Sequence, residues 1–165
     1  MNETTSFRDH FQKLLKTFDT VMLVTQADGH LRARPMAIAQ IEDDWRLWFI
    51  SGANSDNDRK IRADTRVLLV CQKDHSIYLA LNGRASVSRD RSKIAEVWQE
   101  AFRVWFPDGK EDSNIELICI SPEEGEYWDN AGMNKVKYAF ESVAAYVTGK
   151  TPSMQEGEQH GRGQL

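Results

Sequence analysis

The sequence has only two cysteines and no long hydrophobic run. Cys71 and Cys119 each lie in an apolar, strand-like stretch, residues 67–71 and 115–120, so we expect buried thiols in the core, with a disulfide or redox role as the alternative. No run reaches the roughly 18 apolar residues that a membrane-spanning helix needs, and the N-terminal segment lacks the apolar centre of a secretory signal. We therefore expect a cytoplasmic protein without a membrane partner.

An excess of basic charge and the common catalytic motifs are missing as well. The formal net charge is −4, whereas proteins that bind nucleic acid carry a basic face. No Gly-x-Gly-x-x-Gly follows a strand-like stretch, and no Ser-His-Asp or Cys-His arrangement is indicated. The sequence therefore predicts no nucleic-acid partner and no metal site, and it leaves the catalytic residues unknown. None of the four histidines has metal-ligand spacing; they are His10, His30, His75 and His160.

The residues that are present suit one globular domain. Hydrophobic residues make up 41% of the chain and include five tryptophans, enough for one core in a chain of this length. The last stretch is polar and contains glycines, which is typical of a mobile tail. We expect one domain over residues 1–149 and a mobile tail over residues 150–165.

Hydrophobic periodicity predicts the order of helices and strands. Apolar residues at helical spacing predict a helix over residues 6–17 with Ser6 as its cap, and a long helix from Asp90 through Trp105. Alternating and β-branched stretches predict strands, with Asp28-Gly29 as the first hairpin turn. These strands cover residues 20–25, 31–41, 45–50, 67–72, 77–87, 115–120 and 125–129, and two more helices cover residues 55–64, capped by Ser55 or Asp56, and 135–147.

Most of these strands follow one another through hairpin turns, whereas a parallel sheet needs crossover connections. Strands and helices also do not alternate regularly, as they do in a doubly wound fold. The order therefore favours a mainly β fold with α-helices, an antiparallel barrel with peripheral helices.

Two arginines mark the strand that follows the first hairpin turn. Arg32 and Arg34 lie two residues apart, so their side chains project from one face of the strand, about 7 Å apart. Pro35 cannot donate a hydrogen bond to a neighbouring strand, which predicts an edge or a bulge with backbone groups free to bind a ligand. The alternative is that both arginines are solvated surface residues.

A second basic pair, Arg59 and Lys60, lies in the helix expected over residues 55–64. Unpaired backbone amides and the helix dipole favour an anion at a helix N-terminus. Together with the arginine strand, this predicts a receptor for a phosphate group on a flat, apolar ligand. The alternative is a solvated helix face on which Asp56 and Asp58 pair with the two bases.

Several short motifs lie along residues 7–130 in a characteristic order: DGHLRARPM at 28–36, LWFIS at 47–51, RKI at 59–61, NGRA at 82–85, DR at 90–91, WFPDG at 105–109 and EYWD at 126–129. In their order and spacing they resemble the flavin-mononucleotide-binding split β-barrels related to pyridoxamine 5′-phosphate oxidase, and within them the general stress protein subgroup. The resemblance implies an antiparallel split β-barrel with peripheral helices.

The resemblance also implies a homodimer that holds flavin mononucleotide (FMN) in the cleft between its subunits. The arginine strand would line the flavin ring and ribityl chain, and Lys60 with Arg59 would bind the phosphate. Trp128 would reach the flavin, either within its own subunit or from the other subunit. The alternative is that Trp128 is a core or interface residue. The cofactor-binding residues implied in this way are Arg32, Ala33, Arg34, Pro35, Met36, Ile50, Ser51, Ser55, Arg59, Lys60 and Trp128.

Two departures from the family pattern bear on function. Asp58 stands where related sequences usually have serine before the basic pair, so we expect Ser55 to supply the hydroxyl while Asp58 turns outward or pairs with Arg59. Residues 127–133 replace the Arg-Leu-His-x-Arg type of sequence with which pyridoxamine phosphate oxidases bind the substrate phosphate. We therefore expect no useful production of pyridoxal phosphate.

The leading hypothesis is an FMN-binding general stress-type protein that acts as an oxidoreductase on an unknown small substrate. A flavin ring performs electron or hydride transfer itself, so the lack of a catalytic motif is compatible with redox chemistry. One alternative is a flavin-binding stress or sensor protein without turnover. Another, which follows from Asp58, is a split barrel that binds haem or no cofactor.

Overall fold

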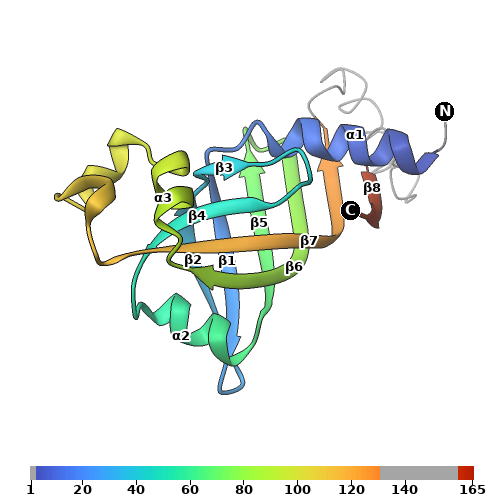
Figure 1. The fold of residues 1–165 in the computed structure, drawn as a ribbon. Helices are drawn as coiled ribbons and strands as arrows, with labels where there is room; N and C mark the ends of the chain where they lie inside the picture. The colour runs from blue at the N-terminus through green and yellow to red at the C-terminus, as the bar shows by residue number, and fades with distance from the viewer. Residues whose placement is uncertain (1–2, 131–159) are drawn as a thin grey trace, which may run out of the picture.

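The computed structural model describes residues 3–130 and 160–165. Its strands form one sheet in the order β2-β1-β5-β6-β7-β4-β3, with β8 paired to β7 (Figure 1). Every pairing is antiparallel. The strands are β1 (Thr20–Ala27), β2 (His30–Ala37), β3 (Gln40–Ile41), β4 (Leu47–Gly52), β5 (Arg66–Lys73), β6 (Ile77–Ser88), β7 (Ile115–Asp129) and β8 (His160–Gln164).

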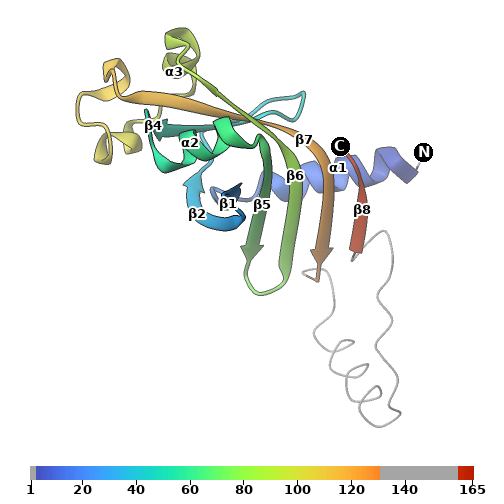
Figure 2. The ribbon, with the colours of Figure 1, turned by 90° about the horizontal axis from the view of Figure 1, so that it is seen from below.

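The long strands β6 and β7 curve from one half of the sheet into the other (Figures 1 and 2). Their register shifts between Asn82 and Gly83, and Gly83 lies opposite Pro122. Proline cannot donate to a ladder and is tolerated at such a bulge. A Cβ at Gly83 would lie 2.5 Å from the carbonyl oxygen of Ser121, so this bend requires glycine. The curved, open sheet confirms the predicted antiparallel split β-barrel.

Two helices cover opposite ends of the barrel, α1 (Glu3–Leu15) at one end and α2 (Asp56–Ala63) at the other (Figures 1 and 2). Both bury apolar side chains in the same core: Phe11 and Leu15 from α1 and Ile61 from α2. From the strands, the core takes alternate residues, as expected when one face of a sheet is buried. These include Val21, Leu23, Leu47, Phe49, Val67, Leu69, Cys71, Leu79, Leu81, Ile118, Ile120 and Tyr127.

A second apolar cluster lies on the other face of β4 and the first half of β7, under helix α3 (Arg91–Val97). It contains Trp48, Ile94, Val97, Phe106, Ile115, Leu117 and Cys119. Residues 115–120 are therefore buried on both faces, which explains why they form a continuous apolar run in the sequence. Both cysteines are buried and free, as the sequence predicted, and desolvation raises the pKa of the Cys71 thiol to about 12.

The long helix predicted from Asp90 through Trp105 is wrong. Asp90 does cap α3, where its carboxylate accepts from the backbone N–H of Ser92 at 2.9 Å. The helix ends at Val97, however, because Trp98 takes an extended conformation, and the chain continues as the 3-10 helices η1 (Glu100–Val104) and η2 (Gly109–Glu111). The periodicity misled because apolar residues on both sides of the break enter the same second cluster.

Several predicted boundaries also differ from the structure. Helix α1 begins at Glu3, so Ser6 lies inside the helix and does not cap it. The strand predicted over 31–41 is divided, because residues 38 and 39 turn to hydrogen-bond Asp19 and Trp48. The strands predicted over 115–120 and 125–129 are one strand, since the bulge accommodates Pro122 without ending the pairing.

The C-terminal residues belong to the sheet. Residues 160–164 lie in the segment expected to be a mobile tail, but they form β8 and pair with residues 124–128 of β7. The helix predicted over 135–147 lies outside the described residues. Within the part of the chain that is described, no helix is long and apolar enough to cross a membrane.

Candidate functional site

Three of the four predicted basic residues, Arg34, Arg59 and Lys60, meet at the N-terminal end of α2. Ser55 caps this helix, as its Oγ accepts from the backbone N–H of Asp58 at 3.2 Å. The hydroxyl oxygen of Ser51, near the end of β4, lies 3.2 Å from the same Oγ. The two serines predicted to contribute to the site are therefore in contact, and both lie beside the first turn of α2, where unpaired amides favour an anion.

Three cations surround one carboxylate in this first turn. Lys60 and Arg34 both donate to Oδ2 of Asp56, and Nη2 of Arg59 lies 3.2 Å from its Oδ1. The hydrogen bond from Lys60 holds the pKa of the Asp56 carboxyl below its usual value, and the charges of Arg34 and Arg59 act in the same direction. Arg34 comes from β2 and the other two from α2, so the fold builds the cluster from segments far apart in sequence.

Strand β2 presents its two faces to different surroundings. Arg34 lies directly opposite the buried Leu23 and Arg32 opposite the buried Thr25, so both arginines share the face that continues into the barrel core. Arg32 itself is exposed, and its guanidinium makes no ion pair or hydrogen bond with the residues that the structure describes. The prediction that the two arginines project from one face of the strand is therefore confirmed.

The remaining predicted residues of β2 divide between these faces. Met36 shares the arginine face, and its sulfur accepts from Nδ2 of the buried Asn57 at 3.6 Å. Ala33 and Pro35 point to the opposite, outer face. Strand β2 is the edge of the sheet next to β1, which confirms the edge position predicted from Pro35.

The prediction for Asp58 is wrong. Its side chain is 5% exposed, so it does not turn outward, and it pairs with Arg62 at 2.6 Å rather than with Arg59. The partner four residues along the helix is the favourable one, because residues at this spacing lie on the same face of a helix. Asp58 is therefore compensated by its own arginine and directed away from the basic cluster.

Arg62 also reaches a buried glutamate that the sequence analysis missed. Its Nη2 donates to Oε1 of Glu116 at 2.9 Å, and Arg89 donates to the same oxygen at 3.2 Å. Glu116 is 1% exposed and lies opposite Ser51 in the pairing of β4 with β7. One glutamate inside the apolar run 115–120 was the available signal, since a buried carboxylate requires cationic partners. This network fixes α2, and hence Lys60, to the sheet.

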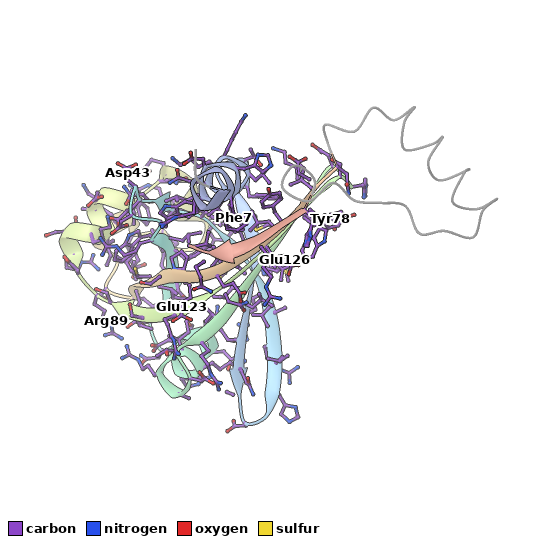
Figure 3. All side chains as sticks on the ribbon, turned by 90° about the vertical axis from the view of Figure 1, so that its right-hand side faces the viewer. Phe7, Asp43, Tyr78, Arg89, Glu123 and Glu126 are labelled. Carbon is purple, nitrogen blue, oxygen red and sulfur yellow. The ribbon has the colours of Figure 1, made fainter. Side chains whose placement is uncertain are left out.

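Two predicted residues do not join the basic cluster. Ile50 points away from Ser51, since successive residues of a strand alternate, and it packs against the second apolar cluster. Trp128 lies near the end of β7, opposite Tyr78, and stacks on His160 with ring centroids 5.4 Å apart. Figure 3 shows Tyr78 near that end of the strands and Arg89 near the other. Within one chain, Trp128 is therefore remote from α2.

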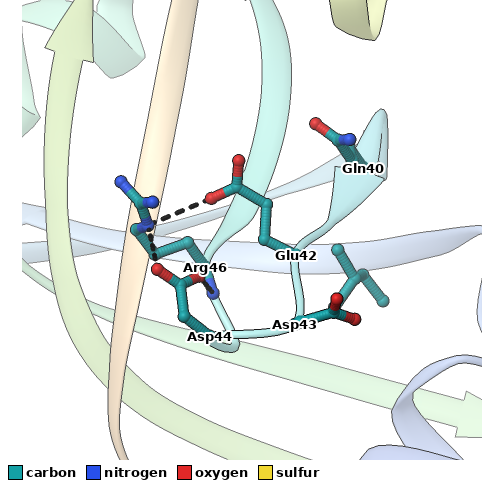
Figure 4. A pocket seen from close by; sticks show the side chains of 6 residues that line it. Gln40, Glu42, Asp43, Asp44 and Arg46 are labelled. Atoms are coloured by element: carbon teal, nitrogen blue, oxygen red, sulfur yellow. Dashed lines mark hydrogen bonds and ion pairs between the residues drawn. The ribbon is translucent and has the colours of Figure 1, made fainter.

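A surface hollow lies over the turn between β3 and β4 (Figure 4). Arg46 is paired there with Glu42 at 3.0 Å and with Asp44 at 2.8 Å, and a hydrogen bond from Lys93 lowers the pKa of Glu42. The carboxylates that line this hollow make it unsuited to binding a phosphate. No cluster of potential metal ligands occurs among the residues for which the structure gives positions.

Fold and site together define a split-barrel protein with a basic cluster at the N-terminal end of one helix. The chain belongs to the family described as pyridoxamine 5′-phosphate oxidase like, whose model matches residues 7–153. The family predicted from the motifs is thereby confirmed. No curated protein matches the sequence.

Solved structures with the same fold include general stress proteins. A candidate general stress protein 26 from Jannaschia sp. CCS1 is 24% identical, with a TM-score of 0.73 over 98% of this chain and 99% of that one. General stress protein 26 from Bacillus anthracis is 20% identical, with a TM-score of 0.66 over 73% and 92%. The general stress FMN/FAD binding protein from Xanthomonas citri is 27% identical, with a TM-score of 0.65 over 77% and 91%.

Proposed function

We propose that this protein binds FMN, with the phosphate at the N-terminal end of α2. The convergence of Arg34, Arg59 and Lys60 beside the Ser55 cap is the observation that carries the proposal. Cationic side chains, a hydroxyl and unpaired helix amides are the groups that bind a phosphate monoester. The protein from Xanthomonas citri described as an FMN/FAD binding protein supports a flavin as the ligand.

The residues around this cluster fit the rest of the cofactor. Arg32 and Met36 lie on the same face of β2 as Arg34, and the exposed guanidinium of Arg32 suits the polar ribityl chain or ring edge. Ser51 adds a second hydroxyl. When bound, a flavin supplies electron or hydride transfer, and these residues would hold and orient it. We infer that the protein is an oxidoreductase whose substrate is a small molecule other than pyridoxamine phosphate. We also infer that it acts in the cytoplasm.

We also propose that the protein is a homodimer that pairs through the outer face of β1, β5 and β6. Met22 lies opposite Val70, and Val70 opposite Ala80, so these apolar side chains form a row on the face opposite the core. Met22 and Val70 are each 39% exposed. Pro35 extends the row to β2, and Trp128 lies on the same outer face, because it pairs with Tyr78, two residues before Ala80.

Absorption spectroscopy with added cofactors tests the flavin proposal. The purified protein should retain flavin absorption bands after FMN is added and free ligand removed, and it should bind riboflavin more weakly because riboflavin lacks the phosphate. FAD serves as the comparison. Bleaching of the bands by NADH or NADPH would support the oxidoreductase, whereas tight binding without reduction would favour a storage or sensor protein. A protein that stays colourless contradicts the proposal.

Light scattering after size exclusion tests the homodimer. The wild-type chain should run at twice its monomer mass, and Val70→Glu should run as a monomer, because a charge in the centre of an apolar interface is costly to bury. Val104→Glu is the control, since Val104 is 78% exposed and lies in η1. A monomeric wild type contradicts the proposal, and a dimeric Val70→Glu variant assigns the interface to another face.

A further inference from the structure

The basic cluster at α2 already holds an anion, the carboxylate of Asp56. Three cations converge on it, two of them on the same oxygen: Arg34 and Lys60 on Oδ2, and Arg59 on Oδ1. Every cation assigned to the phosphate is thus paired inside the protein. A carboxylate and a phosphate accept the same donors in similar geometry.

The position of Asp56 strengthens this competition. It is the first residue of α2, beside the amides and the positive end of the dipole that favour an anion. Lys60 is only 13% exposed at its side chain, so its pairing with Asp56 is screened less by solvent than an exposed pair. A phosphate that binds Lys60 must displace the Asp56 carboxylate. The displaced carboxylate stays nearby and, because it is also negatively charged, repels the bound phosphate.

Asp58, the acidic residue that departs from the family pattern, does not take part in this competition. It is buried and paired with Arg62, and Arg62 in turn with Glu116. The acidic side chain that faces the cations is Asp56.

We propose that Asp56 is an internal competitor for the phosphate site and lowers the affinity of the protein for phosphate-bearing ligands. The inference rests on the proposed FMN function and deepens it. FMN exchanges with the Asp56 carboxylate for Arg34, Arg59 and Lys60, so FMN binds less tightly than it would without this carboxylate. Riboflavin, which has no phosphate, does not enter this exchange.

Fluorescence titration of Asp56→Asn with FMN and riboflavin tests the proposal. The variant should bind FMN about tenfold more tightly, the effect expected when one like charge is removed from beside a bound anion, and riboflavin with unchanged affinity. The gain in FMN affinity should shrink at high salt. Asp64→Asn is the control, because Asp64 pairs with Arg66 at the other end of α2. Asp56→Ser is a second variant in case asparagine disturbs the first turn.

Three results would overturn the proposal: unchanged FMN affinity, weaker FMN affinity, or an equal gain for riboflavin. The first two leave the FMN function itself intact if the wild type binds FMN. If neither the wild type nor Asp56→Asn binds any flavin, the FMN proposal fails. The competition by Asp56 is then tested separately, by titration with inorganic phosphate in which the melting temperature is the readout. Phosphate should then stabilise Asp56→Asn at lower concentration than the wild type; equal concentrations contradict the competition.

Discussion

Lys60→Gln is expected to weaken FMN binding by about 10- to 100-fold. A hydrogen bond to a charged group contributes about 1.5–3 kcal/mol, and 1.4 kcal/mol corresponds to tenfold in affinity. Lys60 is the least exposed of the three cations in the cluster, at 13% against 45% for Arg34 and 67% for Arg59, so its charge acts on the phosphate through the least solvent. The measurement is fluorescence titration with FMN and riboflavin.

The substitution also leaves Asp56 without its lysine, so the two effects should be coupled. Adding Asp56→Asn to Lys60→Gln should restore part of the lost affinity, and a double-mutant cycle gives the size of the coupling. Lys13→Gln, on the exposed side of α1, serves as the control. An equal loss of riboflavin affinity would mean that Lys60 acts on the ring or on the fold rather than on the phosphate.

The largest effect on stability is expected for Phe11→Ala, which should lower the free energy of unfolding by about 3–5 kcal/mol, as for other fully buried phenylalanines. The Phe11 ring is 0% exposed. It contacts Gly125 of β7, where a side chain would clash with the ring, and it lies 6.1 Å from the ring of Trp45. Its removal leaves a cavity between α1 and the sheet, at the end of the barrel remote from α2. Urea denaturation measures the change.

Trp105→Ala is the matched aromatic control, because Trp105 is 65% exposed. Its unfolding free energy should change by less than about 0.5 kcal/mol. Flavin affinity measured well below the unfolding transition should be the same in Phe11→Ala and in the wild type. A change of similar size in both aromatic variants would show that the contact between α1 and the barrel is not the source of the stability.

The strands could be predicted because alternation is a local signal that the fold preserved. The end of the helix after Asp90 could not be predicted. Ile94 and Phe106 enter one cluster from two separate segments, and a cluster of this kind produces helical spacing without a continuous helix. The break occurs at Trp98, which takes an extended conformation and whose indole N–H donates to Glu100 at 3.1 Å. This is a contact that the apolar pattern does not encode.

The candidate site was predicted in part for similar reasons. The pairing of Asp56 with Arg59 and Lys60 was among the alternatives of the sequence interpretation. The pairing of Asp58 with Arg62 was missed, although residues four apart share one face of a helix, because Asp58 was expected to turn outward or to pair with Arg59. Arg34, by contrast, reaches Asp56 from 22 residues away. That contact exists only because the barrel brings the edge strand against α2, so no local pattern could reveal it.

Strand β7 connects two apolar clusters that alternate residue by residue along one segment. Ile118 and Ile120 belong to the barrel core, whereas Leu117 and Cys119 belong to the cluster under α3. If either cluster loses its packing, β7 is displaced and the other cluster loses contacts as well. The barrel and the α3 layer therefore form one cooperative unit, which should unfold in a single transition. The backbone amide hydrogens of β7 should exchange with solvent only when the whole unit unfolds.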